Sequence, residues 1–358
     1  MIKTFLRDSA IYVIPVILSR GIGFLLLPVY TRYLSPSDYG VIEFLGVAYA
    51  MLNLLLPLEV SQAVARFLPE AEIRKKILYA STSFWFTAIV FSIFALIVWL
   101  FPETMGRIIL GGSEFVDVVS LGALAMIANA LFYLIQNQLR WNLQSRASAG
   151  VGVVFSIAMA VVAVTLIVFF DYGVLGFIWG QLSASAIALA IGLYVSRNAI
   201  PLRLCLDISL LKEMLSFSAP LVLSSLAVYF SLYADRWALR EFLGIEDVGI
   251  YGVAYRVASI TALGITAFQM AISPLVYKHY KEPDTVRAIG RIFSYFLLLT
   301  LPLIGLIAAF SIEIISIITT PEYQSADRLA PWLALATVLM GIYVFAPGLG
   351  VAKKTRKI

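Results

Sequence analysis

Charged side chains are scarce in this 358-residue chain: Asp, Glu, Lys and Arg together make up 13% of it, whereas hydrophobic residues make up 61%. A water-soluble globular domain has about a quarter of its residues charged. The composition therefore excludes a soluble globular protein and is typical of a polytopic membrane protein.

Cysteine and histidine are nearly absent as well, with one residue of each, Cys205 and His279. A single cysteine cannot form an intrachain disulfide, and a single histidine in a charged connection offers neither a metal-binding cluster nor a Ser/His pair. The glycine-rich Lys-Ser/Thr loop that cradles nucleotide phosphates is missing too, which excludes ATP hydrolysis through that motif. We therefore expect no enzymatic activity, no cofactor and no bound metal.

Ten long apolar stretches account for most of the chain. A helix that crosses the hydrocarbon core needs about 20 apolar residues. Stretches of that order occupy residues 11–29, 41–68, 77–101, 118–139, 147–170, 172–196, 214–234, 257–277, 292–312 and 329–352. The sequence therefore predicts an all-α, polytopic membrane protein with about ten transmembrane helices.

Lysine and arginine are distributed unevenly between the two sides of these stretches. Eighteen of them, including Lys75 and Lys353, fall on one side, and five fall on the other. Because cytoplasmic loops carry the excess of basic residues, the bias predicts a multi-pass protein of the inner (plasma) membrane with both termini in the cytoplasm. The bias also accounts for the formal net charge of +5 without a nucleic-acid partner.

The chain resembles itself at an offset of 209 residues. Lys3, Leu6, Ser9, Ala10 and Val13 fall on Lys212, Leu215, Ser218, Ala219 and Val222, and Leu34, Asp38 and Gly40 fall on Leu243, Asp247 and Gly249. Six predicted helices separate the two copies, so both copies have the same orientation, as in parallel repeats. We predict two lobes, residues 1–208 with six helices and residues 209–358 with four. The alternative is a passive bundle in which these matches arise by chance.

Five charged residues at or near membrane depth are the candidate site residues: Arg20, Glu59, Asp235, Arg236 and Arg256. A charge at this depth is costly, so it normally faces the interior of a bundle or a wet cavity. We predict that the three arginines and Asp235 line a substrate cavity, since arginine suits phosphate binding.

Other roles for these charges stay open. Glu59 and Asp235 are candidates for ion coupling, but Glu59 with Arg256, or Glu59 with Arg20, can equally form a structural pair. Asp235 has no opposite charge three or four residues away on its own helix. Its partner is therefore expected on another helix, in water or on a ligand.

Four segments resemble one family of transporters. They are TRYLSPSDYGVIEF at 31–44, DRWALREFLGIEDVGIYGVAYR at 235–256, ISPLVYKHY at 272–280 and GLGVAKKT at 348–355. Together with the lead-in at residues 3–10 they are similar to polysaccharide flippases of the Wzx type, which belong to the MOP superfamily with lipid II flippases and MATE drug exporters. The resemblance covers nearly the whole chain, and the segment 235–256 is its most specific part.

The resemblance implies a function for the two lobes. Such proteins have a MATE-like bundle of two six-helix lobes and flip undecaprenyl-diphosphate-linked oligosaccharides by alternating access, for O-antigen, lipopolysaccharide and other cell-envelope polysaccharides. Membrane lipids, and possible polymerase and chain-length proteins, are the implied partners. Family members have at least twelve helices, so a chain of ten is expected to lack the last two helices of the second lobe.

Two alternatives remain open at the level of the sequence. One is a MATE-like, cation-coupled exporter of amphipathic small molecules, for which Asp235 would bind the ion. The basic Arg20 at the midpoint of the first stretch disfavours cationic drugs. The other is a scaffold for glycan-synthesis enzymes that transports nothing.

Overall fold

The computed structural model describes residues 21–345 except 263, 266–267 and 269–283. Within these residues the chain is helical and contains no strand. It forms two compact units, residues 1–249 and 250–358. The all-α fold predicted from the sequence is confirmed. The predicted boundary between lobes at residues 208/209 stays a prediction.

Unit 1 contains the described helices from α2 to α11, and α12 crosses the boundary between the two units. The elements of unit 1 are α2 (Leu27–Tyr33), α3 (Pro36–Leu55), α4 (Val60–Phe67), α5 (Ile73–Leu100), α6 (Pro102–Leu110), η1 (Ser113–Phe115), α7 (Val116–Trp141), α8 (Ser145–Val168), α9 (Gly173–Ser196), α10 (Ile208–Ser218) and α11 (Leu221–Phe242). Next come α12 (Ile245–Ala258), then α14 (Asp284–Ala309), α15 (Ser311–Ile318), η2 (Pro321–Arg328), α16 (Ala330–Ile342) and η3 (Tyr343–Phe345).

Six helices in the described part of the chain are long and apolar enough to cross a membrane, or seven if the bent pair α10 and α11 is one span. Four of them, α5, α7, α8 and α9, coincide with predicted stretches to within a few residues. The first predicted stretch lies mostly outside the described residues, and so does much of the eighth. About ten spans is thus supported in part.

The stretch 41–68, predicted as one span, is not one continuous helix. α3 ends at Leu55 and α4 begins at Val60. Pro57 lies in the break and has no N–H to continue the helical bonds. Leu58 and Glu59 have left-handed backbones, with φ of 48° and 55°. Hydropathy does not record such a break, since all but one of the four residues between the helices are apolar.

The stretch 214–234 is interrupted as well. α10 ends at Ser218, α11 begins at Leu221, and the two helices meet at an angle of 50°. Pro220, which occupies the N-cap of α11, explains the interruption. At its start α10 is capped by Asp207, whose side chain accepts from the N–H groups of Ser209 and Leu210. These bonds hold the pKa of Asp207 below its usual value, and the bond from the N–H of Leu210 has the largest effect.

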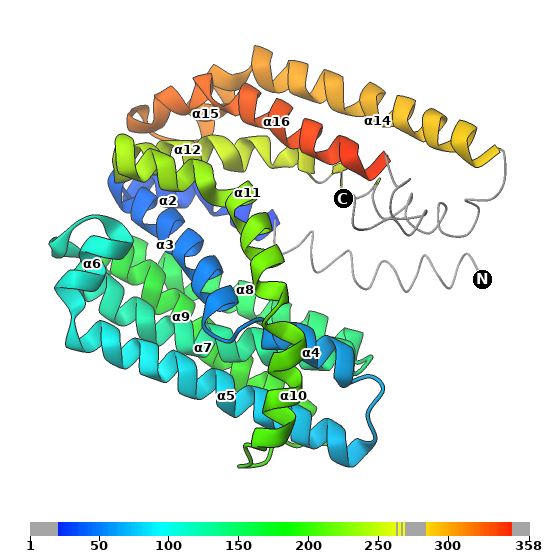
Figure 1. The fold of residues 1–358 in the computed structure, drawn as a ribbon. Coiled ribbons are helices and arrows are strands. Elements are labelled where there is room, and N and C mark those ends of the chain that lie inside the picture. The colour runs from blue at the N-terminus through cyan, green and yellow to red at the C-terminus, as the bar shows by residue number, and fades with distance from the viewer. Residues whose placement is uncertain (1–20, 263, 266–267, 269–283, 346–358) are drawn as a thin grey trace. The chain divides into compact units, whose positions relative to one another are not determined.

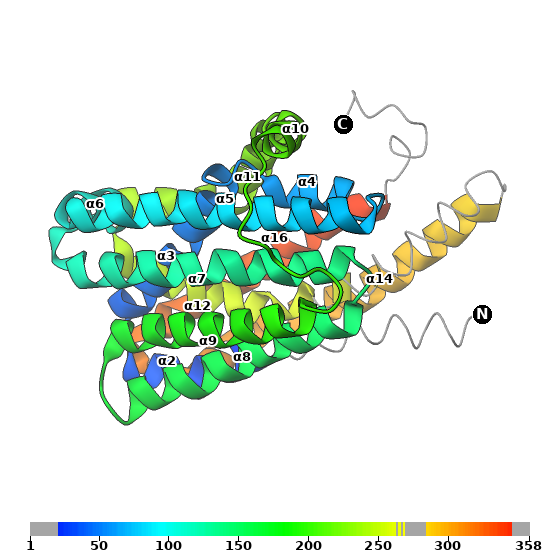
Figure 2. The same ribbon diagram turned by 90° about the horizontal axis from the view of Figure 1, so that it is seen from below.

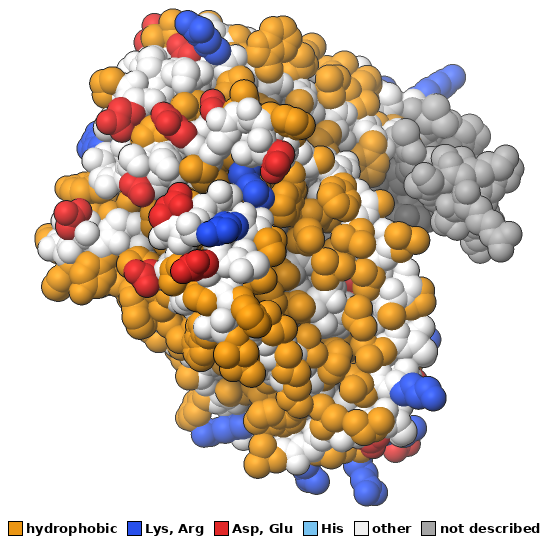
Figure 3. Space-filling model, turned by 60° about the vertical axis from the view of Figure 1, so that its left-hand side comes forward, with side chains coloured by type: hydrophobic (Ala, Val, Ile, Leu, Met, Phe, Trp, Pro, Cys, Tyr) orange, Lys and Arg blue, Asp and Glu red, His pale blue; other side chains and the backbone are white. Residues whose placement is uncertain are grey.

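The long helices α5, α7, α8 and α9 run side by side in unit 1 (Figures 1 and 2). Phe132, Ile135 and Ala188 are among the buried residues between them. The outer face of α5 is different, because Ile93, Leu96 and Leu100 are each more than half exposed. Figure 3 shows hydrophobic side chains gathered over a broad area of one face, with charged side chains set apart from it. Such a surface suits contact with lipid.

Unit 2 pairs α14 with α16 (Figure 1). Aromatic rings fill its interior: Phe345 lies 4.9 Å from Phe296 and 5.0 Å from Phe293 between ring centroids. Tyr323 of η2 is fully buried. The unit therefore has an apolar core of its own.

Two segments that the 209-residue offset aligns meet where α3 and α12 begin. A Cβ atom on Gly40 would collide with the carbonyl oxygen of Ile245, and one on Gly249 would collide with that of Pro36. The offset of 209 residues carries Pro36 onto Ile245 and Gly40 onto Gly249. The contact is thus reciprocal between the two segments that this offset aligns.

This contact makes opposite effects predictable for two glycines of α3. Gly40→Ala should lower the free energy of unfolding by about 1–3 kcal/mol, because the new methyl group overlaps backbone that cannot yield. Gly46 has no atom within 4 Å of the position of a Cβ, so Gly46→Ala should raise stability by about 0.5–1 kcal/mol. Thermal unfolding in detergent measures both. Equal melting temperatures for the two variants would contradict the close contact.

Candidate functional site

A cavity of about 370 Å³ lies between α3 and α11 at the break in the second span. We call it the α3–α11 cavity. Five polar side chains line it, namely Glu59, Ser224, Ser225, Tyr229 and Tyr233, and the remaining lining residues are apolar. A concave, mainly apolar site with a few convergent polar groups is the usual form of a ligand-binding site.

The break places Glu59 at this cavity. The residue is the N-cap of α4 with φ 55° and ψ 30°, and its N–H donates to the carbonyl of Leu54 at 3.3 Å. Among the described residues, no basic side chain lies within ion-pair distance of its carboxylate. The carboxylate can therefore accept hydrogen bonds from hydroxyl groups or bind a cation.

The polar residues of α11 were missed by the sequence analysis. Ser225, Tyr229 and Tyr233 recur every four residues, so they lie on one face of the helix. This spacing was visible in the sequence as a polar stripe within an apolar stretch. Charge alone does not reveal this stripe, because none of the three side chains is charged.

A cluster of contacts joins α3 to α11 beyond Tyr229. The Tyr229 hydroxyl donates to the carbonyl of Val47 at 3.1 Å, and Nε1 of Trp237 donates to that hydroxyl at 2.7 Å. The Trp237 ring meets Phe44 edge-on, with 4.8 Å between centroids. These contacts lie beside the cavity, which Tyr229 also lines.

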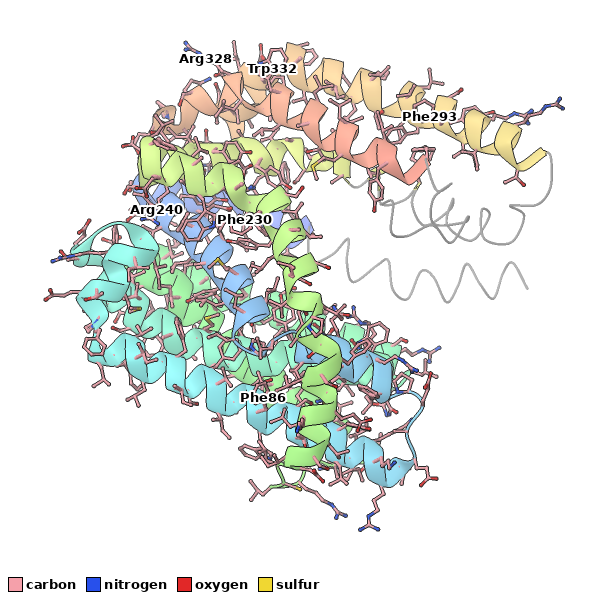
Figure 4. The ribbon with its side chains drawn as sticks, in the orientation of Figure 1. Phe86, Phe230, Arg240, Phe293, Arg328 and Trp332 are labelled. Carbon is pink, nitrogen blue, oxygen red and sulfur yellow. The ribbon has the colours of Figure 1, made fainter. Side chains whose placement is uncertain are left out.

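Arg240 extends this cluster to a third helix. Its Nη1 donates to the carbonyl of Ile108, in the last turn of α6, at 3.2 Å, and its guanidinium carbon lies 5.2 Å from the Phe44 ring centroid. The arginine side chain is 12% exposed. Figure 4 shows it where α3 and α6 approach the end of α11. A cation at a helix C-terminus and over an aromatic ring is favourable on both counts.

Asp235 and Arg236 lie next to the cavity but do not line it. Nη1 of Arg236 lies 3.1 Å from Oδ1 of Asp235 and donates to the carbonyl of Leu232 at 3.2 Å. Asp235 thus has a partner on its own helix, one residue away, in addition to the partner beyond the helix that the sequence predicts. The long arginine stem folds back onto the preceding residue, a geometry that spacings of three and four do not cover.

The other two predicted site residues are not brought to this cavity by the described contacts. Arg20 lies outside the described residues. Arg256 belongs to unit 2, where its side chain is exposed. The pairing of Glu59 with Arg20 or with Arg256 stays a prediction.

Comparison with known proteins gives the context for this site. A family described as polysaccharide biosynthesis protein matches residues 5–279, and the MatE family matches residues 220–356. A protein of Haemophilus influenzae named Lsg locus putative protein 1 is 22% identical over 307 residues, covering 84% of this chain and 73% of that protein.

Solved transporters share the fold. An inward-facing multidrug-resistance MATE transporter of the MOP superfamily superposes with a TM-score of 0.65 at 16% identity, covering 96% of this chain and 82% of that one. A MATE transporter of Vibrio cholerae gives a TM-score of 0.63 at 15% identity, covering 98% and 84%. With the family match over most of its length, the chain belongs to the polysaccharide biosynthesis protein family, and it has the fold of the MATE transporters.

Proposed function

We propose that the protein translocates polyprenyl-diphosphate-linked oligosaccharide units, such as those on undecaprenyl diphosphate, across the membrane by alternating access. The family and the MATE-like fold support a transporter of polysaccharide units. The α3–α11 cavity carries the proposal further. Its serine, tyrosine and carboxylate oxygens match the hydroxyl groups of a glycan, because they accept and donate hydrogen bonds.

The free energy of transfer determines which part of the substrate passes through the protein. The polyprenyl tail stays in the hydrocarbon, where it is already soluble, while the sugars pass through the protein. A diphosphate needs cationic partners, and Arg20, Arg236 and Arg256 are the candidates. Membrane lipids surround the protein, and polymerase and chain-length proteins are candidate partners in polysaccharide synthesis.

A second candidate function is cation-coupled export of amphipathic small molecules. Glu59 favours it, since a carboxylate at the cavity attracts cations. Gain of resistance in a drug-sensitive host that expresses the chain would support this function. A third is a scaffold for glycan-synthesis enzymes, which co-purification of such enzymes without flipping activity would favour.

The main proposal is tested in proteoliposomes. We expect the purified chain to move a polyprenyl-diphosphate-linked oligosaccharide between leaflets, measured as the fraction of glycan that an external glycosidase can reach. Protein-free vesicles serve as the negative control, and vesicles with a full-length relative as the positive control. Movement in the positive control but not with this chain would contradict the proposal.

Two roles are proposed for Arg20, contact with the diphosphate and pairing with Glu59, and variants distinguish them. If it contacts the diphosphate, Arg20→Ala should abolish translocation without lowering protein abundance, and Arg20→Lys should restore part of it, since lysine keeps the charge but loses the planar fork. If it pairs with Glu59, removal of either residue strands the other charge at roughly 3–5 kcal/mol. The two roles are distinguished by measuring the abundance and the translocation activity of Arg20→Ala, Glu59→Ala and the double variant. An unstable single variant rescued by the double variant contradicts substrate contact.

Orientation is tested by cysteine labelling. Lys75 and Glu114 are both exposed, and the positive-inside bias assigns Lys75 to the cytoplasm and Glu114 to the outside. In a Cys205→Ser background, Glu114→Cys should react with an impermeant maleimide in intact cells, and Lys75→Cys only after permeabilisation. The reverse pattern would contradict cytoplasmic termini in an inner-membrane protein.

A further inference from the structure

A second cavity, of about 210 Å³, lies on the other side of the broken segment. It is bounded by α3, the start of α4, α5 and α7, and we call it the α5–α7 cavity. Its polar lining consists of Asn53, Ser61, Thr87, Tyr133 and Asn137. It shares the break with the α3–α11 cavity, because Leu54 and Glu59 line one cavity and Asn53, Pro57 and Val60 line the other.

Thr87 gives the first sign that this cavity holds a ligand. The residue is 3% exposed, yet its hydroxyl has no hydrogen-bond partner in the part of the chain that the structure describes. Other buried threonines, such as Thr31 and Thr300, return the hydroxyl to the carbonyl four residues earlier. A buried hydroxyl without a partner costs about 1–3 kcal/mol, so a group that enters the cavity and bonds to it relieves this cost.

The break leaves a second group, the carbonyl of Asn53, without its helical donor. In a continuous helix the carbonyl of Asn53 accepts from the N–H of residue 57. Pro57 has no N–H, so the Asn53 carbonyl lacks this donor. The side chains of Asn53 and Pro57 both line the cavity. Neutral oxygen and amide groups thus converge on it from α3 and α5.

Charge and size narrow the class of ligand. Every polar side chain of the lining is neutral, so burial of an ion there would go uncompensated. Hydroxyls and amides both donate and accept, which matches the hydroxyl groups of a sugar. The volume has space for about seven waters, the size of one sugar ring rather than of an oligosaccharide. Phe91 and Tyr133 offer apolar surface, and Tyr133 is held 4.9 Å from the Phe132 ring.

We propose that the α5–α7 cavity binds one neutral sugar residue, with the Thr87 hydroxyl and the amide of Asn53 as hydrogen-bond partners. The proposal rests on the proposed function in one respect, that the sugar belongs to the glycan being moved. Thr87 is then a residue that selects for hydroxyl groups, because an apolar ligand leaves it without a partner. Ordered water is the other source of hydroxyl groups for this cavity.

Thr87→Val tests the proposal because valine has nearly the shape of threonine and lacks only the hydroxyl. Since no bond within the protein is lost, the variant should melt at or above the temperature of the wild type. Glucose and N-acetylglucosamine, added separately to the purified full-length chain, are the probes. At least one should raise the melting temperature of the wild type, and Thr87→Val should weaken its apparent affinity about 2–10-fold, the equivalent of one hydrogen bond.

Two further variants serve as controls. Glu59→Gln changes the α3–α11 cavity and should leave the Thr87-dependent part of the shift intact. Thr82→Val removes a hydroxyl that accepts from the N–H of Asp207 at 3.1 Å, so it should lower the melting temperature without removing the sugar-dependent shift. This pair separates loss of binding from loss of stability.

The outcomes distinguish the sugar site from the proposed function. An equal sugar-dependent shift in the wild type and Thr87→Val, or no shift with either sugar in the wild type, overturns the proposal and leaves water as the occupant. A Thr87-dependent shift in a chain that moves no lipid-linked glycan in vesicles supports the sugar site and contradicts the proposed function. The two can therefore fail separately.

Discussion

Backbone hydrogen bonding is the constraint on which this structure depends. In a bilayer no water pairs with free N–H and C=O groups, so a spanning segment is a continuous helix unless protein or a wet cavity takes up the groups that a break releases. α5, α7, α8 and α9 meet this constraint without interruption. The second span does not, and both cavities that border its break carry polar side chains. The break at Pro220 precedes the serines that face Glu59 across the α3–α11 cavity.

The two cavities differ in what they offer. The α3–α11 cavity has a carboxylate in its lining, whereas the lining of the α5–α7 cavity carries no charge. One short irregular segment, residues 56–59, separates them. Its left-handed residues, Leu58 and Glu59, are in conformations that cost free energy and that persist where the surrounding structure or function requires them. A change in the backbone course of this segment would move lining residues of both cavities, whereas a change confined to the Glu59 side chain acts on the α3–α11 cavity.

Much of the fold could be predicted from the sequence, because length and apolar composition dictate a membrane helix. The break at residues 56–59 could not be placed from hydropathy, although Pro57 marks a point where a helix bends. The residues of the candidate site were harder to predict from the sequence. Glu59 was singled out by its charge, but Tyr229 and Arg240 act through contacts with Val47 and Ile108, residues far away in the sequence. No pattern along one helix reveals such partners.

The meeting of Gly40 and Gly249 has a mechanical consequence. Side chains that interdigitate hold two helices in one register, and a shift of the helices requires new rotamers on both. At these glycines backbone faces backbone, with a carbonyl of each helix against the glycine of the other. A small shift of α3 against the start of α12 at this point therefore requires no change of rotamer at the two glycines. The contact therefore restrains α3 and the start of α12 through the distance between their backbones and not through interlocking side chains.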